Sequence, residues 1–318
     1  MGDIVLATPV IEKLSDQYPN ANIDFLLKYG YEGVLYRHPK LHFVIVWDKT
    51  EKKYKHLIEL IKIIRETKYD AVINLQRFAS SGLITALSGS KIRIGFNKNP
   101  LSILFTKRIK HNIGSPGSPH ETVRNLKLIE CITDGGSAPM KLYPSKQDFA
   151  KVSQYKTVAF ITIAPASLWF TKQYPEDKWI DFAEKMDNDT RIYFLGSPKE
   201  KQLCQRIIDN SGHTNSLNLS GEMSFLESAA LMKDALMNFV NDSAPMHFAS
   251  AMNANTTVIY CSTVPDFGFG PLSENSQIIE TKKHLDCKPC GLHGFKTCPK
   301  KHFECATTID TKQLLDVI

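Results

Sequence analysis

Hydrophobic and polar positions follow two successive series of short apolar runs separated by amphipathic stretches. Apolar runs of about four to eight residues indicate buried strands, whereas apolar positions spaced three and four apart indicate helices. In the first series these patterns predict strands at 21–28, 42–47, 71–76 and 91–96, and helices at 3–15, 54–67, 80–88 and 118–131. Such alternation favours a parallel sheet with crossover helices.

A second series repeats the same alternation. It predicts strands at 157–164, 191–196, 217–221, 235–240 and 256–261, and helices at 175–186, 198–210, 224–233 and 245–252. Residues 135–153 separate the two series and have little periodicity, so we interpret them as a linker. We therefore expect an α/β protein with an N-terminal domain at 1–150 and a C-terminal domain at 151–318.

Three further stretches lack strand or helix periodicity and are expected to be irregular. They are a basic loop at 98–110, a turn at 115–118 and a Gly- and Pro-containing loop at 264–271.

Length and composition agree with a soluble two-domain protein. The chain has 318 residues, of which 42% are hydrophobic and 23% charged, which is ordinary for globular proteins. No apolar run reaches the roughly 18 residues that span a membrane, and Asp3 stands where a secretory signal would be basic. The net charge of +6 permits attraction to anionic lipid or an acidic substrate, and solvated charge explains it equally well. We expect no nucleic-acid partner.

The stretch 241–250 carries the first candidate for chemistry. It joins a predicted strand to a predicted helix, with Ser243 as a cap and Pro245 in the first turn. A helix start at the carboxyl end of a strand offers free N–H groups to an anion, and Asp242 beside it could bind sugar or ribose hydroxyls. His247 flanks the same turn. The alternative is an ordinary capped helix.

A second candidate follows the strand at 157–164. Lys172 could act there as a mobile ammonium that neutralises a diphosphate, or it could be a solvated surface lysine. A place in one crevice with Asp242 would favour the first role, since ligands of tandem α/β domains bind at the carboxyl ends of strands.

Candidates for the acceptor side lie in the first half. Asp3, at a helix start, could take a proton from an attacking hydroxyl, or it could only cap its helix. Arg77, His120 and Arg124 could hold acidic groups of an acceptor, with surface ion pairing as the alternative.

Seven cysteines, an odd number, indicate a reducing compartment. Four of them form an irregular C-x2-C-x7-C-x6-C pattern near the C-terminus: Cys287, Cys290, Cys298 and Cys305. Their count allows a structural zinc site, and free thiols or disulfides remain open as alternatives.

The motifs together resemble glycosyltransferase family 9, the heptosyltransferases of lipopolysaccharide core synthesis. The stretches that carry the resemblance are GDIVLATP at 2–9, INLQRFASSGLITALSGSKIRIGF at 73–96, 120–128, APASLWFTKQYP at 164–175, 241–249 and 268–271. The cysteine-containing tail also resembles one found in many members. The resemblance covers nearly the whole chain.

That resemblance implies a GT-B fold, in which two Rossmann-like domains flank an interdomain cleft. It implies inverting transfer of heptose from an ADP-heptose to lipid A-linked inner core, without a metal or other required cofactor. By the match, Asp3 resembles the family's general base and Lys172 its diphosphate-binding lysine, with Ser167 and Thr171 in the same loop. The donor-binding helix start would comprise Asp242, Ser243, Ala244 and His247.

Two departures from the family pattern stand out. The family usually has Gly where this chain has Ala244, and a methyl group there could crowd a close phosphate. The family also has a central strand before the Gly-Asp loop, whereas here Met1 directly precedes Gly2. We expect that this first strand of the N-terminal domain is missing and that the true start lies roughly ten residues upstream, allowing for a strand of typical length.

The sequence thus predicts a cytoplasmic transferase that binds a nucleotide sugar, lipid A-linked core oligosaccharide and the inner-membrane surface. The alternatives are a GT-B-type sugar-nucleotide epimerase, which needs no acceptor, and a non-catalytic relative that holds nucleotide or lipid.

Overall fold

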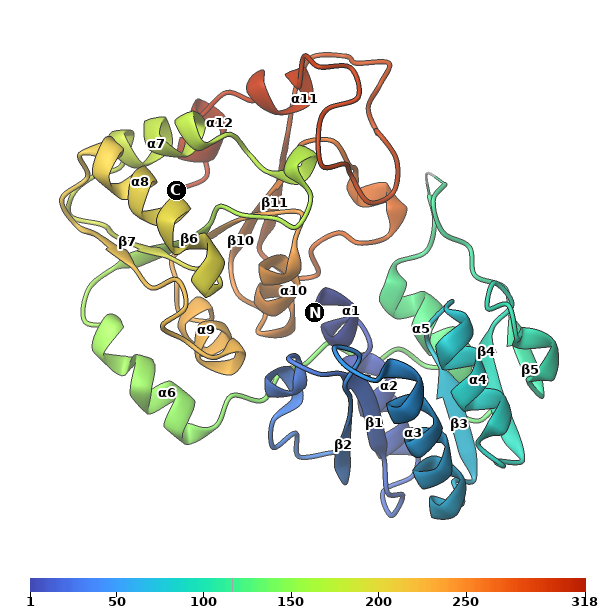
Figure 1. Ribbon diagram of the computed structural model, residues 1–318. Helices are drawn as coiled ribbons and strands as arrows, with labels where there is room; N and C mark the ends of the chain where they lie inside the picture. Colours follow the sequence, from blue (N-terminus) through green and yellow to red (C-terminus); the bar gives the residue numbers. More distant parts are fainter. Residues whose placement is uncertain (116) are drawn as a thin grey trace. The chain divides into compact units, whose positions relative to one another are not determined.

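The computed structural model describes residues 1–115 and 117–318, so Pro116, within the predicted turn at 115–118, lies outside the described residues. The chain folds into two compact units, which we call the N-terminal unit (Asp3–Lys141) and the C-terminal unit (Leu142–Ile318). Figure 1 shows the helices and strands of each unit.

The C-terminal unit is built on one six-stranded parallel sheet. Its strand order is β11-β10-β9-β6-β7-β8. The strands are β6 (Phe160–Ala164), β7 (Arg191–Phe194), β8 (Ser216–Asn218), β9 (Asn238–Asn241), β10 (Thr256–Tyr260) and β11 (Ser276–Glu280). Every residue of β6, β9 and β10 is buried, as expected for central strands of a sheet covered on both faces.

The helices of this unit cover both faces of that sheet. Figure 1 shows α7, α8 and α12 on one side, and α9 and α10 on the other. The helices are α6 (Lys146–Val152), α7 (Glu176–Lys185), α8 (Lys201–Ser211), α9 (Phe225–Met232), α10 (Ala244–Ala251), α11 (Glu304–Thr307) and α12 (Lys312–Leu315). Trp179, Phe182 and Phe239 lie in the core between α7 and the sheet, all without exposed surface.

The order in which the chain adds strands to this sheet changes side at β6, although all six strands are parallel. From β6 the chain runs outward through β7 to β8, and it then returns to the other side of β6 at β9. The loops after β6 and β9 therefore flank a topological switch point, the place where doubly wound α/β folds bind their ligands.

The N-terminal unit contains two parallel sheets in its described residues. One pairs β1 (Asp24–Lys28) with β2 (Phe43–Trp47), and the other has the order β3-β4-β5. The strands of the second sheet are β3 (Ala71–Asn74), β4 (Ile92–Phe96) and β5 (Lys107–Ile109). The further upstream strand expected from the sequence stays a prediction.

Helices cover these two sheets in two layers of contact. α3 (Lys53–Thr67) contacts β2, α4 (Ala79–Leu87) contacts β3 and α5 (Glu121–Ile129) contacts β4, while α2 (Thr8–Gln17) packs on α5. Leu57, Leu60 and Ile64 of α3 pack with Trp47 of β2, and Leu128 of α5 packs with Ile94 and Phe96 of β4.

The predicted helix at 3–15 is wrong in one respect, because the structure breaks it into α1 (Gly2–Val5) and α2. Pro9 lies in the first turn of α2, where its missing N–H costs nothing, whereas inside a longer helix its ring would clash with the Val5 carbonyl. Thr8 Oγ1 donates to that carbonyl instead, at 2.8 Å.

Three stretches predicted to be irregular contain regular elements. The loop at 98–110 includes a 3₁₀ turn, η2 (Ser102–Leu104), and the edge strand β5, and the loop at 264–271 includes η6 (Pro265–Phe267). The linker at 135–153 includes α6, which starts with a reciprocal capping box between Ser145 and Asp148. β11, α11 and α12 were not predicted at all.

Candidate active site

An ion pair between Lys172 and Asp242 lies at the switch point of the C-terminal sheet. Lys172 ends η4 (Phe170–Lys172) in the loop after β6, and Asp242 directly follows β9. Lys172 Nζ lies 2.5 Å from Asp242 Oδ2, with the two side chains 15% and 9% exposed. Lys172 and Asp242 were predicted as separate candidates from two stretches of the sequence. The structure brings them together at the place where this kind of fold binds its ligands.

A second bond fixes the Asp242 carboxylate. Thr263 Oγ1, after β10, donates to Asp242 Oδ2 at 2.6 Å. In the part of the chain that the structure describes, Asp242 Oδ1 makes no hydrogen bond. The protein thus holds one carboxylate oxygen, while the other can accept a hydrogen bond from a hydroxyl group of a ligand.

Asn241 ties the two loops of the switch point together. This side chain has no exposed surface; it accepts from the Tyr174 N–H at 2.9 Å and donates to the Pro165 carbonyl at 2.7 Å. Because both the oxygen and the NH2 group of this amide are bonded, the loop after β6 is fixed relative to the end of β9. The backbone position of Lys172 in that loop is fixed with it.

The helix α10 starts beside Asp242, as predicted, with Pro245 in its first turn. Ser243 occupies the N-cap position, but its side chain makes no capping bond and donates to the Asn241 carbonyl at 3.3 Å. The N–H groups at this helix start therefore keep their capacity to bind an anion. Ala244 is half-buried at the first helical position, and His247 is buried within the helix.

The cysteine-containing tail packs against the Lys172 loop. Thr171 donates its N–H to the Phe295 carbonyl at 3.1 Å, and its hydroxyl accepts from the Phe295 N–H at 2.8 Å and from Ser262 Oγ at 3.0 Å. Thr171 is 1% exposed, so it positions the loop and does not itself face a ligand.

Gly294 approaches the same loop so closely that a side chain would not fit. A Cβ atom there would lie 2.9 Å from Lys172 Cγ and 3.0 Å from Thr171 Oγ1, and its φ of +75° also favours glycine. The tail thus shapes the space in which the Lys172 side chain runs.

The four tail cysteines are free thiols, as are the other three. Cys287 Sγ lies 3.7 Å from His302 Nε2, and Cys290 Sγ donates to the Cys287 carbonyl at 2.9 Å. Burial, together with the neighbouring Cys287, raises the pKa of the Cys290 thiol. Within residues 1–115 and 117–318, no three His, Cys, Asp or Glu side chains gather around one point.

The other predicted nucleotide-binding residue, Ser167, is half-buried in the loop after β6. Its carbonyl accepts from Gln173 Nε2 at 2.6 Å, which closes the loop on itself.

In the N-terminal unit, Asp3 lies exposed in the first turn of α1. Arg77 follows β3 and is half-buried, and His120 is the N-cap of α5, where its Nδ1 accepts from the Thr122 N–H at 3.3 Å. Arg124 is 3% exposed, and its guanidinium bonds Glu121 and the Pro119 carbonyl. Arg124 therefore braces the start of α5 and is poorly placed to contact an acceptor directly.

Sequence reasoning did not single out Asn241, Thr263, Ser262 or Gly294 as members of this site. The available signal for Asn241 was its place directly after the predicted strand 235–240 and beside Asp242. Thr263, Ser262 and Gly294 make contacts between segments that are far apart in the chain, and no local sequence pattern predicts such contacts.

The sequence profile of Glycosyltransferase family 9 (heptosyltransferase) matches residues 57–300. Lipopolysaccharide heptosyltransferase 3 of Escherichia coli K12 is 26% identical over 290 residues, which cover 86% of this chain and 83% of that protein.

Two solved structures share the fold. The structure of E. coli ADP-heptose lps heptosyltransferase II has a TM-score of 0.80 at 20% identity and covers 99% of this chain and 94% of its own. E. coli heptosyltransferase WaaC with ADP-2-deoxy-2-fluoro heptose has a TM-score of 0.70 at 17% identity and covers 99% of this chain and 96% of its own. The predicted fold, two Rossmann-like α/β domains of the GT-B type, is confirmed.

Proposed function

The chain belongs to glycosyltransferase family 9, and from that membership we propose that it is an inverting enzyme that transfers heptose from an ADP-heptose to the inner core of lipopolysaccharide. The observation that carries the proposal is the Lys172–Asp242 pair at the switch point of the C-terminal sheet. It puts a cation, a carboxylate and a helix start at the place where such a fold binds a nucleotide.

The donor would be held by the C-terminal unit. Lys172 and the N–H groups at the start of α10 would meet the diphosphate, and Asp242 Oδ1 would accept a hydroxyl of the ribose or the sugar. Ser167 lies in the same loop as Lys172, while Thr171 positions that loop. Ala244 and His247 would complete the helix start, the methyl group of Ala244 setting how closely a phosphate can approach.

Transfer needs a base and a stabilised leaving group. Asp3 would take the proton from the attacking hydroxyl of the acceptor, whose oxygen then bonds the anomeric carbon of the heptose from the face opposite ADP. The bond between that carbon and the β-phosphate oxygen breaks with inversion, and ADP leaves with its new charge met by Lys172 and backbone N–H groups. No step requires a metal ion.

The acceptor would be held by the N-terminal unit. Arg77 makes no ion pair with any described part of the chain, so its guanidinium can meet an acidic group of the acceptor. His120 flanks the start of α5. Arg124 would act through Glu121 by fixing that helix start.

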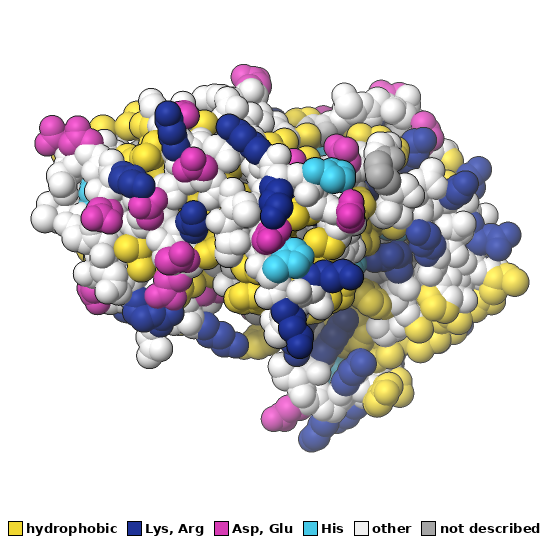
Figure 2. Space-filling view, turned by 90° about the horizontal axis from the view of Figure 1, so that it is seen from above, with side chains coloured by type: hydrophobic (Ala, Val, Ile, Leu, Met, Phe, Trp, Pro, Cys, Tyr) yellow, Lys and Arg dark blue, Asp and Glu magenta, His cyan; other side chains and the backbone are white. Residues whose placement is uncertain are grey.

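We also propose a cytoplasmic location at the inner-membrane surface. None of the helices described above combines the length and the apolar composition of a bilayer span. The segment 103–108 has instead an apolar and a basic part, since Ile103 and Leu104 are 77% and 51% exposed and Lys107 and Arg108 are exposed beside them. Figure 2 shows Lys and Arg side chains together with hydrophobic ones on the right of the view, the side on which β5 lies in Figure 1. Such a combination suits an anionic lipid surface.

A thermal-shift screen of nucleotide sugars tests the donor assignment. A ligand at a hundredfold excess over its dissociation constant stabilises a protein by about 2.7 kcal/mol, so preferences among nucleotides become visible as shifts in Tm. We expect ADP and ADP-heptose to stabilise the chain more than UDP- or GDP-sugars do. Equal shifts for all three classes would contradict the proposal.

The two alternatives have distinct signatures in the same material. An epimerase would convert the sugar nucleotide when mixed with it alone, and a non-catalytic relative would bind the nucleotide without turnover. The proposed transferase requires both donor and acceptor.

A further inference from the structure

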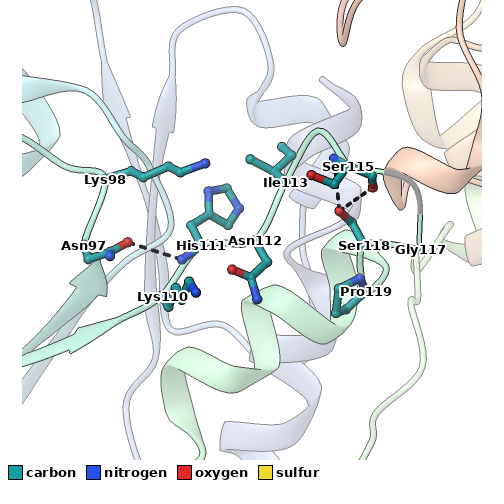
Figure 3. Close-up of a pocket in the computed structure, with 10 residues that line it drawn as sticks. All are labelled: Asn97, Lys98, Lys110, His111, Asn112, Ile113, Ser115, Gly117, Ser118 and Pro119. Carbon is teal, nitrogen blue, oxygen red and sulfur yellow. Dashed lines mark hydrogen bonds between the residues drawn. The ribbon is translucent and has the colours of Figure 1, made fainter. Parts of the chain in front are cut away.

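A cavity of about 470 Å³ lies in the N-terminal unit, where β4 and β5 end and α5 begins. Figure 3 shows the residues that line it. Its polar lining includes Asn97, Lys98, Lys110, His111, Asn112 and Ser118. None of these residues belongs to the site described above.

His111 is the buried centre of this lining. It is 3% exposed and stacks on Phe96, with ring centroids 4.0 Å apart and planes 21° apart. Neither ring nitrogen makes a hydrogen bond in the described residues: Nε2 lies at ion-pair distance from Glu121 Oε2, 3.5 Å away, and Nδ1 has no polar neighbour of this kind. Because an unmet polar atom in a protein interior costs about 1–3 kcal/mol, a ligand atom is the natural partner for Nδ1.

The charges around the cavity are positive. Lys98 and Lys110 are exposed at its edge, and neither forms an ion pair within residues 1–115 and 117–318. The carboxylate that faces His111, Glu121, is already bonded by Arg124. Burial alone would raise the pKa of Glu121, but the neighbouring His111 and Arg124 outweigh burial and lower that pKa, so this carboxylate stays ionised.

Two amides add neutral donors to the lining. Asn97 Oδ1 accepts from the His111 N–H at 3.3 Å, which leaves the NH2 group of Asn97 as a donor. The Asn112 side chain lines the same cavity (Figure 3). Ser118 is committed to the turn, since its hydroxyl donates to the Ser115 carbonyl at 2.7 Å.

We propose that this cavity binds an anionic oxygen group, a phosphate or a carboxylate, carried by the acceptor. The proposal rests on the transfer function proposed above, and it assigns the N-terminal unit a specificity-determining subsite. Lys98 and Lys110 supply charge, and Asn97 and Asn112 supply amide N–H groups. His111, as the imidazolium, donates from Nδ1 to the bound anion and from Nε2 toward Glu121.

Acceptor kinetics provide the first test. The double substitution Lys98→Ala and Lys110→Ala removes two charged contacts, and each such contact contributes enough for about a tenfold change in binding. We expect the acceptor KM to rise about tenfold or more, while the donor KM and kcat stay unchanged. Lys127→Ala is the matched control, because Lys127 is an exposed cation on α5 that does not line the cavity and forms no ion pair among the described residues.

A conservative change at His111 separates binding from folding. His111→Asn keeps a donor near the position of Nδ1, whereas His111→Leu removes it. We expect the acceptor KM of the Leu variant to exceed that of the Asn variant by about tenfold at equal Tm. Equal acceptor KM values for wild type, both His111 variants and the double lysine variant would overturn the proposal.

Inhibition by small anions identifies the group. Inorganic phosphate and gluconate are tested as competitors of the acceptor, the first standing for a phosphate and the second for a sugar carboxylate. We expect one of them to compete in the wild type and to lose its effect in the Lys98→Ala, Lys110→Ala variant. Failure of both to compete would overturn the subsite.

Direct binding separates this proposal from the transfer function. If no acceptor is turned over, the transfer function fails, but calorimetry with phosphate and gluconate on the full chain still tests the cavity. Binding that disappears in the double lysine variant and persists in Lys127→Ala supports the anion site. Binding of neither anion, or identical binding by all three proteins, contradicts it.

Discussion

Lys172 and Asp242, seventy positions apart in the sequence, form a largely buried ion pair with 2.5 Å between Nζ and Oδ2. The carboxylate is anchored by Thr263 and the loop of the lysine by Asn241 and the tail. A buried pair of this kind is weak evidence for stability, since desolvation offsets much of the attraction. Under the proposed function, the position of the pair at the switch point of the sheet would make Lys172 a pre-positioned cation for a diphosphate.

Removing this cation should weaken the donor interaction. For Lys172→Ala we expect the donor-dependent kcat/KM to fall about ten- to a hundredfold, the range for a lost charged hydrogen bond. Steady-state kinetics with varied ADP-heptose measure this. Lys185→Ala is the control, because Lys185 forms only an exposed pair with Asp181. An equal loss in both variants would argue against a specific role for Lys172.

Replacing Asp3 tests the base. Asp3→Ala should lower kcat by about a hundredfold or more, which is typical for loss of a general base, while calorimetry still finds wild-type ADP binding. Asp16→Ala removes another exposed carboxylate of the same unit, on α2, and should leave kcat unchanged. Full turnover by Asp3→Ala would rule out Asp3 as the base.

Gly294 offers a test of the tail as a support for Lys172. Gly294→Ala places a methyl group 2.9 Å from Lys172 Cγ, so we expect ADP binding to weaken and the free energy of unfolding to fall by about 1 kcal/mol or more. Gly291→Ala is matched in backbone strain, with φ +112°, but its Cβ would meet only Phe295, at 3.8 Å. ADP affinities that fall equally in the two variants would show that the contact with Lys172 is irrelevant.

Stability should depend on pH through His38. Burial lowers the pKa of His38 from 6.5 to about 4, against the opposing charge of Glu12. Between these two pH values His38 is protonated in the unfolded chain but not in the folded chain. The free energy of unfolding therefore falls as the pH falls from 6.5 to 4, by about 3 kcal/mol in total. Denaturant unfolding at several pH values should show a flatter slope for His38→Gln. His284→Gln, at an exposed histidine, should retain the wild-type slope.

The segment 103–108 should govern membrane attachment. Ile103→Ser with Leu104→Ser should reduce co-sedimentation with vesicles rich in anionic phosphatidylglycerol, and added salt should reduce it further by screening Lys107 and Arg108. Leu217→Ser removes a comparably exposed apolar side chain from β8 and serves as the control. Unchanged co-sedimentation of the double variant would show that the segment 103–108 is not the membrane-binding surface.

Strands with dense apolar runs could be predicted from the sequence because burial on both faces leaves little choice of residue. β6 (FITIA) and β10 (TTVIY) are examples, each buried throughout. β5 (KRI) was not predicted, because it is an edge strand with two exposed basic side chains and its sequence therefore resembles that of a loop.

The candidate site divides in the same way. Lys172 and Asp242 stand at strand ends, so topology alone predicted that they could meet. Thr263, Gly294 and Phe295 come to the site through contacts between distant segments, which single-sequence patterns do not encode. Arg124 shows the opposite limit: its residue type suggested a ligand contact, whereas burial and the bond to Glu121 decide that it braces a helix.

The most direct test of the proposed activity is an acceptor-dependent transfer assay on the purified chain with ADP-heptose and lipid A-linked core lacking heptose. Mass spectrometry and nuclear magnetic resonance of the product should show one added heptosyl group with inverted anomeric configuration, and one ADP released for each group transferred. Conversion of the sugar nucleotide without acceptor, or ADP binding with no product from any core acceptor, would contradict the account.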